Sequence, residues 1–246
     1  MTLNKSEFSS KLTKIFKQNS LSTYLSVEIA DKLFALTERM LTENEKYNLT
    51  AITELDKIIL NHYADCIKLA PMISKGARII DVGCGAGFPT LPLAIVRPDV
   101  SITALDSTAK RVNYVAETAE LLGLTNVTAI TARAEDLAKQ AEYREAFDYA
   151  TARAVAEMRV LSELCLPFVR VGGSMIALKG KNAQFELADA KRAIAMLGGK
   201  STSLTEVTLV SPEAEILTHP LITVAKGSKT PAAYPRPFAQ ISKKPL

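Results

Sequence analysis

Apolar residues recur every three or four positions in the first part of the chain. This spacing holds over residues 8–16 and again over 29–41, and a third helical stretch covers 56–70 before a proline ends it. Periodicity of this kind indicates amphipathic helices that bury one face. The pattern therefore predicts an N-terminal helical extension over residues 1–70.

After residue 70, short apolar runs alternate with amphipathic stretches such as 110–122. Seven of these runs have the length and composition of strands. They cover residues 77–82, 101–105, 127–131, 147–152, 173–179, 206–210 and 221–226. Strands that alternate with helices at this interval are typical of an α/β fold with a parallel, doubly wound sheet, whose ligands bind at the carboxyl ends of the strands. We expect residues 71–246 to form this domain.

A glycine-rich turn follows the first predicted strand. Gly83, Gly85 and Gly87 can adopt positive φ and let backbone N–H groups approach a ligand without a Cβ in the way. The dinucleotide-binding pattern GxGxxG would require a glycine where the chain has Phe88. The chain instead has an acid, Asp81, followed by a glycine at every second position from 83 to 87. This pattern resembles motif I of the class I S-adenosylmethionine (SAM) methyltransferases, in which the loop receives an amino-acid carboxylate.

The ends of the next strands carry residues suited to the rest of a nucleoside ligand. Asp106 follows the second strand, where a carboxylate can accept hydrogen bonds from two ribose hydroxyls; an acid at a helix N-terminus is the alternative. Ala134 and Glu135 follow the third strand, where they could contact an adenine edge or cap a helix. Arg153 ends an otherwise apolar fourth strand, so it needs either a ligand or a buried partner.

Composition narrows the class of protein. Apolar residues make up 48% of the 246 residues and charged residues 23%, and no apolar run approaches the roughly 20 residues of a membrane span. The start of the chain lacks the pattern of a signal peptide. The three cysteines are too widely spaced for a metal site or a disulfide framework. We therefore expect a cytoplasmic, monomeric protein with no metal and no membrane partner.

Positive charge is concentrated at the C-terminus. The net charge is +4, yet residues 216–246 hold five cations and no acid, together with Tyr234 and Phe238. Five of the eleven prolines also lie here, so the segment is interpreted as too proline-rich to form a helix. Cations and aromatic rings are the groups that bind phosphates and unstacked bases. The segment is predicted to bind RNA, with a solvated C-terminus as the alternative.

Six short motifs, taken together, resemble the glucose-inhibited division protein B family. They are Asn48-Leu49-Thr50-Ala51-Ile52, Asp81-Val82-Gly83-Cys84-Gly85-Ala86-Gly87-Phe88-Pro89, Arg133-Ala134-Glu135, Thr151-Ala152-Arg153-Ala154-Val155-Ala156, Leu178-Lys179-Gly180 and Tyr234-Pro235-Arg236. The resemblance implies a Rossmann-like class I methyltransferase with a mostly parallel seven-stranded sheet and helices on both faces. It also implies methylation of small-subunit ribosomal RNA at guanine N7, with SAM as cofactor. The SAM contacts that it implies are Gly83, Phe88, Ala134, Glu135 and Arg153.

The residues at the strand ends can be tested against this chemistry. Methylation of an exocyclic amine usually goes with an Asn/Asp-Pro-Pro-aromatic loop after the fourth strand, and this chain has none there. Methylation of a pyrimidine carbon needs a cysteine nucleophile, but Cys165 lies beyond the strand end. Guanine N7 has a lone pair and no proton, so it can attack the sulfonium methyl without a general base. His62 and His219 are expected to be structural or surface residues outside the strand-end cluster. Arg153 is the catalytic candidate, placed against the SAM carboxylate because the product purine is cationic.

Recognition of RNA is expected to involve side chains outside the glycine loop. Guanine N7 faces the deep major groove of A-form RNA, so the target base must lie in a loop or leave its stack. The candidate RNA contacts are Lys46, Asn48, Lys179, Lys229 and Arg236, and the expected partner is ribosomal RNA or the small ribosomal subunit. Two alternatives remain open. One is a small-molecule or nucleoside methyltransferase with the same sheet, and the other is a non-catalytic RNA-binding ribosome-assembly factor that holds SAM structurally.

Overall fold

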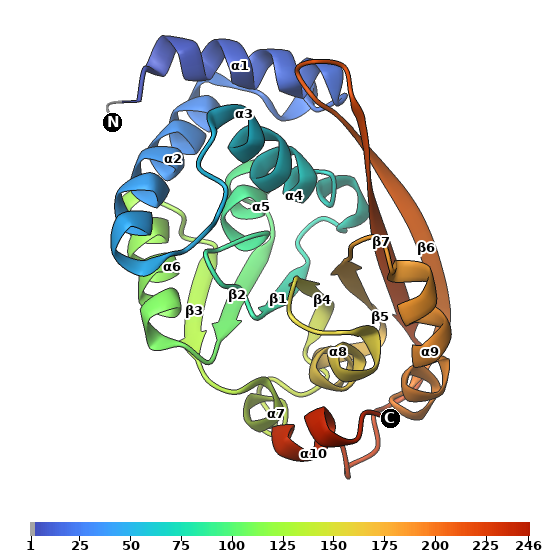
Figure 1. The fold of residues 1–246 in the computed structure, drawn as a ribbon. Helices are drawn as coiled ribbons and strands as arrows, with labels where there is room; N and C mark the ends of the chain where they lie inside the picture. The colour runs from blue at the N-terminus through green and yellow to red at the C-terminus, as the bar shows by residue number, and fades with distance from the viewer. Residues whose placement is uncertain (1–2) are drawn as a thin grey trace.

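Seven strands form one sheet in the computed structural model, which describes residues 3–246 (Figure 1). Their order is β3-β2-β1-β4-β5-β7-β6; β7 runs antiparallel to both neighbours, whereas the other pairs are parallel. The strands are β1 Arg78–Val82, β2 Ser101–Asp106, β3 Val127–Thr131, β4 Phe147–Arg153, β5 Val169–Leu178, β6 Gly199–Val210 and β7 Ile216–Lys226. The expected α/β fold with a mostly parallel, seven-stranded sheet is confirmed.

The N-terminal helices and the helices after β1 and β2 cover one face of the sheet. They are α1 Lys5–Gln18, α2 Val27–Tyr47, α3 Leu55–Ile58, the π-helical turn η2 Ile59–Ala64, α4 Asp65–Ile67, α5 Thr90–Val96 and α6 Ala109–Leu121, with short 3-10 turns at η1 Ser22–Tyr24 and η3 Ala70–Met72. Phe8 and Leu36 from the N-terminal helices share one hydrophobic core with Leu91 of α5 and Ile102 of β2. The predicted helical extension is therefore present, and it packs directly over the sheet.

Four further helices cover the opposite face. They are α7 Ala134–Leu137, α8 Met158–Cys165, α9 Ala183–Met196 and α10 Phe238–Lys243, with a 3-10 turn at η4 Leu166–Phe168. Leu161, Ile194 and Ile241, from α8, α9 and α10, are buried in a second core. Adjacent residues of β1, Ile79 and Ile80, belong to different cores, because successive side chains of a strand point to opposite faces.

The hairpin of β6 and β7 is much longer than the apolar pattern predicts. The strands have twelve and eleven residues and pair from Gly199 with Lys226 to Val210 with Ile216. Most side chains of β6 are exposed, so the strand has little apolar pattern to reveal its length. Its length is set by backbone hydrogen bonds to β7. In Figure 1 the tip of this hairpin reaches the end of α1, where the Asn19 amide donates to and accepts from the Val210 backbone at 2.9 and 2.8 Å.

The C-terminal segment does contain a helix, so the interpretation that it is too proline-rich for one is wrong. Pro237 precedes α10 and Pro245 follows it, while the six helical residues include no proline. Proline disrupts the interior of a helix but is tolerated at its ends. Ile241 of α10 is fully buried. Lys226, counted among the cations of the segment, is also buried and donates to the Leu166 carbonyl at 2.7 Å.

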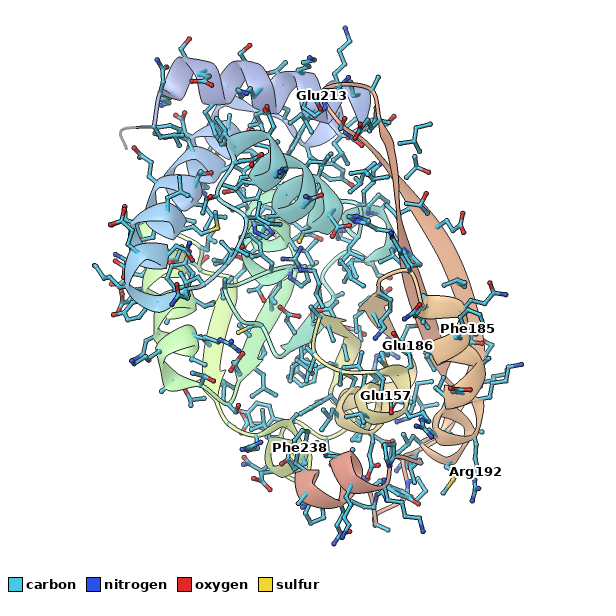
Figure 2. All side chains as sticks on the ribbon, in the orientation of Figure 1. Glu157, Phe185, Glu186, Arg192, Glu213 and Phe238 are labelled. Carbon is cyan, nitrogen blue, oxygen red and sulfur yellow. The ribbon has the colours of Figure 1, made fainter. Side chains whose placement is uncertain are left out.

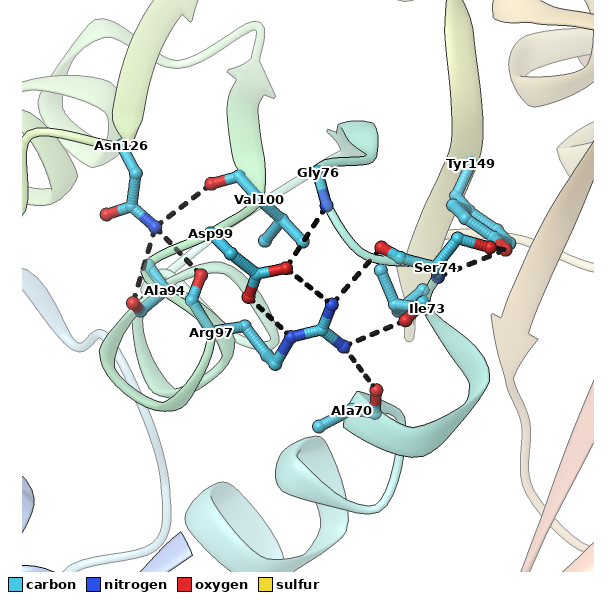
Figure 3. Close-up of polar contacts among 10 residues, drawn as sticks. All are labelled: Ala70, Ile73, Ser74, Gly76, Ala94, Arg97, Asp99, Val100, Asn126 and Tyr149. Atoms are coloured by element: carbon cyan, nitrogen blue, oxygen red, sulfur yellow. Dashed lines mark hydrogen bonds and ion pairs between the residues drawn. The ribbon is translucent and has the colours of Figure 1, made fainter.

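A polar network fixes the connection between the N-terminal helices and β1 (Figure 3). The guanidinium of Arg97, just after α5, donates to the carbonyl oxygens of Ala70 and Ile73 at 2.6 and 2.8 Å. Its Nε lies 2.7 Å from Oδ1 of Asp99, which holds the pKa of that carboxyl well below its usual range. Polar contacts as well as the core therefore cross the expected boundary after residue 70, and a division into two parts stays a prediction.

Two further features bear on partners. Among residues 3–246, no helix is long and apolar enough to cross a bilayer. The same part of the chain places no three His, Cys, Asp or Glu side chains where they could hold a metal ion together. Cys66, Cys84 and Cys165 are buried free thiols, and burial raises the pKa of Cys66 to about 12.

Candidate active site

A pocket of about 260 Å³ lies at the carboxyl ends of β1, β2, β3 and β4. Its volume is slightly below the usual range of small-molecule sites, about 300–1,000 Å³. Residues from four strand ends and from α6, α7, α8 and α10 line it: Val82, Gly83, Leu105, Asp106, Ser107, Arg111, Ala132, Arg133, Ala134, Glu135, Ala154, Val155, Leu164 and Phe238. Four of the expected cofactor contacts, from three separate strand ends, therefore meet in one cavity.

Hydrogen bonds within the protein hold the glycine loop in place. The backbone N–H groups of Gly83 and Cys84 both donate to the Leu105 carbonyl, at 2.7 and 2.9 Å. The N–H of Gly85 donates to Asp106 Oδ2 at 3.1 Å. We expected these N–H groups to face a ligand, but they donate hydrogen bonds to residues at the carboxyl end of β2. The loop therefore shapes the pocket mainly by its close approach to it, and Gly85 positions the Asp106 carboxylate.

The glycines are required at two positions for different reasons. Gly83 lines the pocket with φ +75°, and a Cβ built on it would lie 2.7 Å from Cγ2 of Val155. Gly87 has φ +83°, and its Cβ would lie 2.5 Å from Cδ1 of Leu91 in α5. Gly83 thus keeps space beside the pocket, while Gly87 lets the loop pack on the following helix.

Two buried carboxylates face the same pocket. Asp106 and Glu135 are each 6% exposed, and they come from the end of β2 and from α7. Asp106 also accepts from the Thr108 N–H at 2.8 Å, and Nη1 of Arg111 lies 3.5 Å from it. A ribose diol and an adenine amino group are hydrogen-bond donors that such acceptors can bind. With the space beside Gly83, these residues fit an adenosyl ligand with an amino-acid tail.

Phe88 and Arg153, two other expected SAM contacts, are not among the residues that line this pocket. The Phe88 ring is buried and stacks on the His62 ring, with centroids 4.3 Å apart and planes at 14°. The guanidinium carbon of Arg153 is 5.2 Å from the Phe88 centroid, and Nη1 donates to the Asn61 carbonyl at 2.8 Å. In this structure Arg153 therefore supports the loop from the side of η2.

Arg153 is the centre of a charged cluster that includes both histidines. Its Nη1 lies 3.6 Å from Asp65 Oδ2, and its Nη2 lies 3.2 Å from His62 Nδ1. His219 Nδ1 is 3.0 Å from the other oxygen of Asp65. We expected the histidines outside the strand-end cluster, and that expectation is wrong. They come from η2 and β7, and no local pattern signals their approach to β4.

The two histidines of this cluster have opposite pKa shifts. Burial, and then the charge of Arg153, lowers the pKa of His62 to about 3. The hydrogen bond to Asp65 raises the pKa of His219. Because Arg153 donates to Nδ1 of the neutral His62 ring, the network assigns the ring proton to Nε2, which is 3.0 Å from the Thr50 hydroxyl. His62 is thus unsuited to proton transfer near neutral pH.

A second pocket, of about 300 Å³, adjoins the first and shares Ala154 with it. Arg153, Lys179 and Glu186 are among the charged residues that line it, together with Asp65 and His219 of the cluster. Nζ of Lys179 lies 2.6 Å from Glu186 and donates to the Ala156 carbonyl at 2.7 Å. Lys179, an expected RNA contact, therefore faces this pocket as half of an ion pair.

Asp81, the acid that precedes the glycines, does not reach either pocket. It is almost fully buried and accepts from the hydroxyls of Thr90 and Thr151 at 2.7 and 2.9 Å. Burial raises its pKa to about 6. The carboxylate thus joins the end of β1 to α5 and β4.

The remaining expected RNA contacts are scattered. Lys46 is exposed and pairs with Glu43 at 3.1 Å, and Asn48 ends α2 with φ +49°. Lys229 is exposed after β7. Arg236 is partly exposed and makes an ion pair with the fully buried Glu163, with Nη2 2.6 Å from Oε2. No signal local to residue 236 distinguishes this internal role from an RNA contact.

The histidine pKa shifts predict a specific dependence of stability on pH. In the unfolded chain His62 binds a proton below about pH 6.5, whereas the folded protein resists it down to about pH 3. Stability is therefore lost as the pH falls through this window, by at most about 5 kcal/mol from this group. In urea titrations between pH 4 and 7, His62→Gln should lose less stability on acidification than wild type.

His219→Gln is the matched control for this experiment. Its raised pKa means that His219 stabilises the fold at low pH, and that this contribution is lost as the pH rises through the folded pKa. The difference in unfolding free energy between wild type and this variant should therefore shrink above about pH 6.5. Equal slopes for both variants would contradict the arrangement of the cluster.

Known proteins are similar to this chain over most of its length. A sequence model of GidB, described as rRNA small subunit methyltransferase G, matches residues 29–215. The Ribosomal RNA small subunit methyltransferase G of Clostridium perfringens strain 13 is 51% identical over 216 residues, which cover 87% of this chain and 89% of that protein. The protein of the same name from Clostridium botulinum strain Eklund 17B is 47% identical over 225 residues, covering 90% and 92%.

Two solved structures illustrate the shared fold. A SAM-dependent O-methyltransferase from Thermotoga maritima superposes with a TM-score of 0.52 at 17% identity, over 77% of this chain and 72% of that one. TYW2 from M. jannaschii, solved in complex with AdoMet, gives 0.52 at 16% identity, over 66% and 74%. At such identities the likeness shows a shared fold alone.

Proposed function

Because the chain belongs to the GidB family, rRNA small subunit methyltransferase G, we propose that its strand-end pocket holds SAM for methyl transfer to guanine N7 of 16S ribosomal RNA. The protein is a SAM-dependent 16S ribosomal RNA methyltransferase. One observation carries the site assignment: Gly83, Asp106, Ala134 and Glu135, from three strand ends, line a single pocket.

Each of these residues would have a defined part in binding the cofactor. Asp106, oriented by the Gly85 and Thr108 N–H groups, is placed to accept from ribose hydroxyls. Glu135 and the backbone of Ala134 would contact the adenine edge. Bound SAM supplies an electrophilic methyl group on a sulfonium. The protein's task is to place the acceptor base beside it and to exclude water.

The pocket that adjoins the SAM site is the proposed place for the acceptor guanine. It shares Ala154 with the cofactor pocket, so a base within it would lie next to the donor. Lys179 and Glu186 line it and would offer a donor and an acceptor to a purine. N7 carries no proton, and the neutral, buried His62 removes none. The chemistry therefore depends on positioning.

Arg153 is proposed to act mainly by positioning. Asn61, His62 and Asp65 engage both of its terminal nitrogens, and its charge lies over Phe88. It would hold the glycine loop and the wall of the acceptor pocket in one arrangement. Contact with the SAM carboxylate, the role first expected for it, stays a prediction. A cytoplasmic location and a monomeric state remain expectations as well.

Methyl transfer from labelled SAM tests the function directly. Intact small subunits, naked 16S ribosomal RNA and free guanosine should be compared as acceptors. We expect incorporation into the RNA or the particle and none into guanosine, with a single site revealed by primer extension after chemical cleavage at N7-methylguanine. Methylation of guanosine would favour a nucleoside methyltransferase. SAM binding without transfer to any acceptor would favour a non-catalytic assembly factor.

A further inference from the structure

The C-terminal helix contributes one side chain to the cofactor pocket. Phe238, the first residue of α10, lines the pocket with Arg133 and Ala134. The guanidinium carbon of Arg133 lies 5.6 Å from the centroid of its ring. Figure 2 shows Phe238 beside α7, away from the tip of the β6–β7 hairpin. Phe238 was expected to stack on RNA bases, but its side chain lines the cofactor pocket.

Residues before and after Phe238 in the sequence hold its ring in position. Two residues before it, Arg236 is bound to the fully buried Glu163 of α8 through its backbone N–H, at 2.8 Å, and through its guanidinium. Three residues after it, Ile241 is fully buried in the second core. Phe238 is therefore held in place on both sides in the sequence, although the residue is 38% exposed.

We infer that Phe238 forms the aromatic wall of the adenine end of the SAM pocket, which makes the C-terminal segment part of the cofactor site. The inference rests on the proposed function. The acids placed to bind ribose and adenine, Asp106 and Glu135, line the same cavity as this ring. A purine presents a flat π-face that stacks well on an aromatic ring. Such stacking would also cover the apolar surface that Phe238 leaves exposed.

This role divides the C-terminal segment into residues that serve the cofactor pocket and lysines that stay exposed. Phe238 and the Arg236 anchor serve the cofactor pocket, whereas Lys229, Lys243 and Lys244 are exposed. Cofactor binding and phosphate contacts should therefore respond to different substitutions in the same segment. Removal of the ring should affect SAM at any salt concentration, while removal of the exposed lysines should affect only salt-dependent RNA binding.

Calorimetric titration of Phe238→Ala with two probes tests the inference. The probes are SAM and 5′-methylthioadenosine, which keeps the adenosine but lacks the amino-acid tail. Loss of stacking on one base should weaken both probes by a similar factor, about 5- to 100-fold. In methylation assays the KM for SAM should rise while kcat at saturating SAM stays near that of wild type. Phe238→Tyr should retain most of the affinity.

Matched controls make the result decisive. Phe185→Ala removes another exposed phenylalanine, 76% exposed on α9 and labelled in Figure 2, and it should leave both affinities unchanged. If Phe238→Ala does not fold, Phe238→Leu keeps an apolar side chain without a ring and should show the same direction of change. Wild-type affinity of the Phe238 variants for both probes would overturn the inference. So would a loss confined to SAM. A wild-type protein that binds no SAM would instead overturn the proposed function.

Discussion

Arg236→Ala is expected to lower the free energy of unfolding by about 3–5 kcal/mol, because it leaves a buried carboxylate without its partner. Glu163 is fully buried and receives the Arg236 backbone N–H at 2.8 Å, Nε at 2.9 Å and Nη2 at 2.6 Å. The alanine variant keeps only the backbone bond. Urea denaturation of the two proteins measures the loss directly.

Two comparisons separate this buried pair from a surface charge. Lys229→Ala removes an exposed cation of the same segment and should change stability by no more than about 0.5 kcal/mol. Adding Glu163→Gln to Arg236→Ala removes the unpaired charge and should recover part of the loss. If Arg236→Ala kept wild-type stability but bound RNA more weakly, the result would support Arg236 as an RNA contact and contradict the structural role.

Gly83→Val is expected to reduce SAM affinity by about 100-fold or more, equivalent to about 3 kcal/mol. Gly83 adopts φ +75°, and a Cβ there would lie 2.7 Å from Val155, beside the pocket that both residues line. A branched side chain must displace Val155 or fill the space meant for the ligand. Calorimetric titration with SAM measures the effect. The strained backbone should also cost about 1–3 kcal/mol of stability.

Gly123 supplies the control for backbone strain. It adopts φ +63° after α6, and a Cβ built on it would meet nothing within 4 Å. Gly123→Val should therefore lose stability for the same conformational reason but bind SAM as wild type does. If Gly83→Val also kept wild-type affinity, the glycine loop would not belong to the cofactor site.

Several features of the fold and site follow from local patterns in the sequence. Helical spacing over residues 8–16 and 29–41 matches α1 and α2. The apolar runs locate β1 to β4 to within two residues at each end. Because the carboxyl ends of parallel strands share one edge of the sheet, Gly83, Asp106 and Glu135 could be expected to meet although they are far apart in sequence.

Only the tertiary structure shows which side chains contact residues distant in the sequence. The concentration of positive charge assigned Arg236 to RNA, but its carboxylate partner Glu163 lies 73 residues away in the sequence, on α8. His62 and Arg153 are 91 residues apart in the sequence, yet Nη2 of Arg153 lies 3.2 Å from Nδ1 of His62. The length of β6 and the place of Phe238 in the pocket likewise depend on neighbours from other segments. Periodicity reports which face of an element is buried, because burial repeats with the geometry of that element. It carries no information on which distant side chain will satisfy a charge or cover a ring, since that depends on how the elements pack.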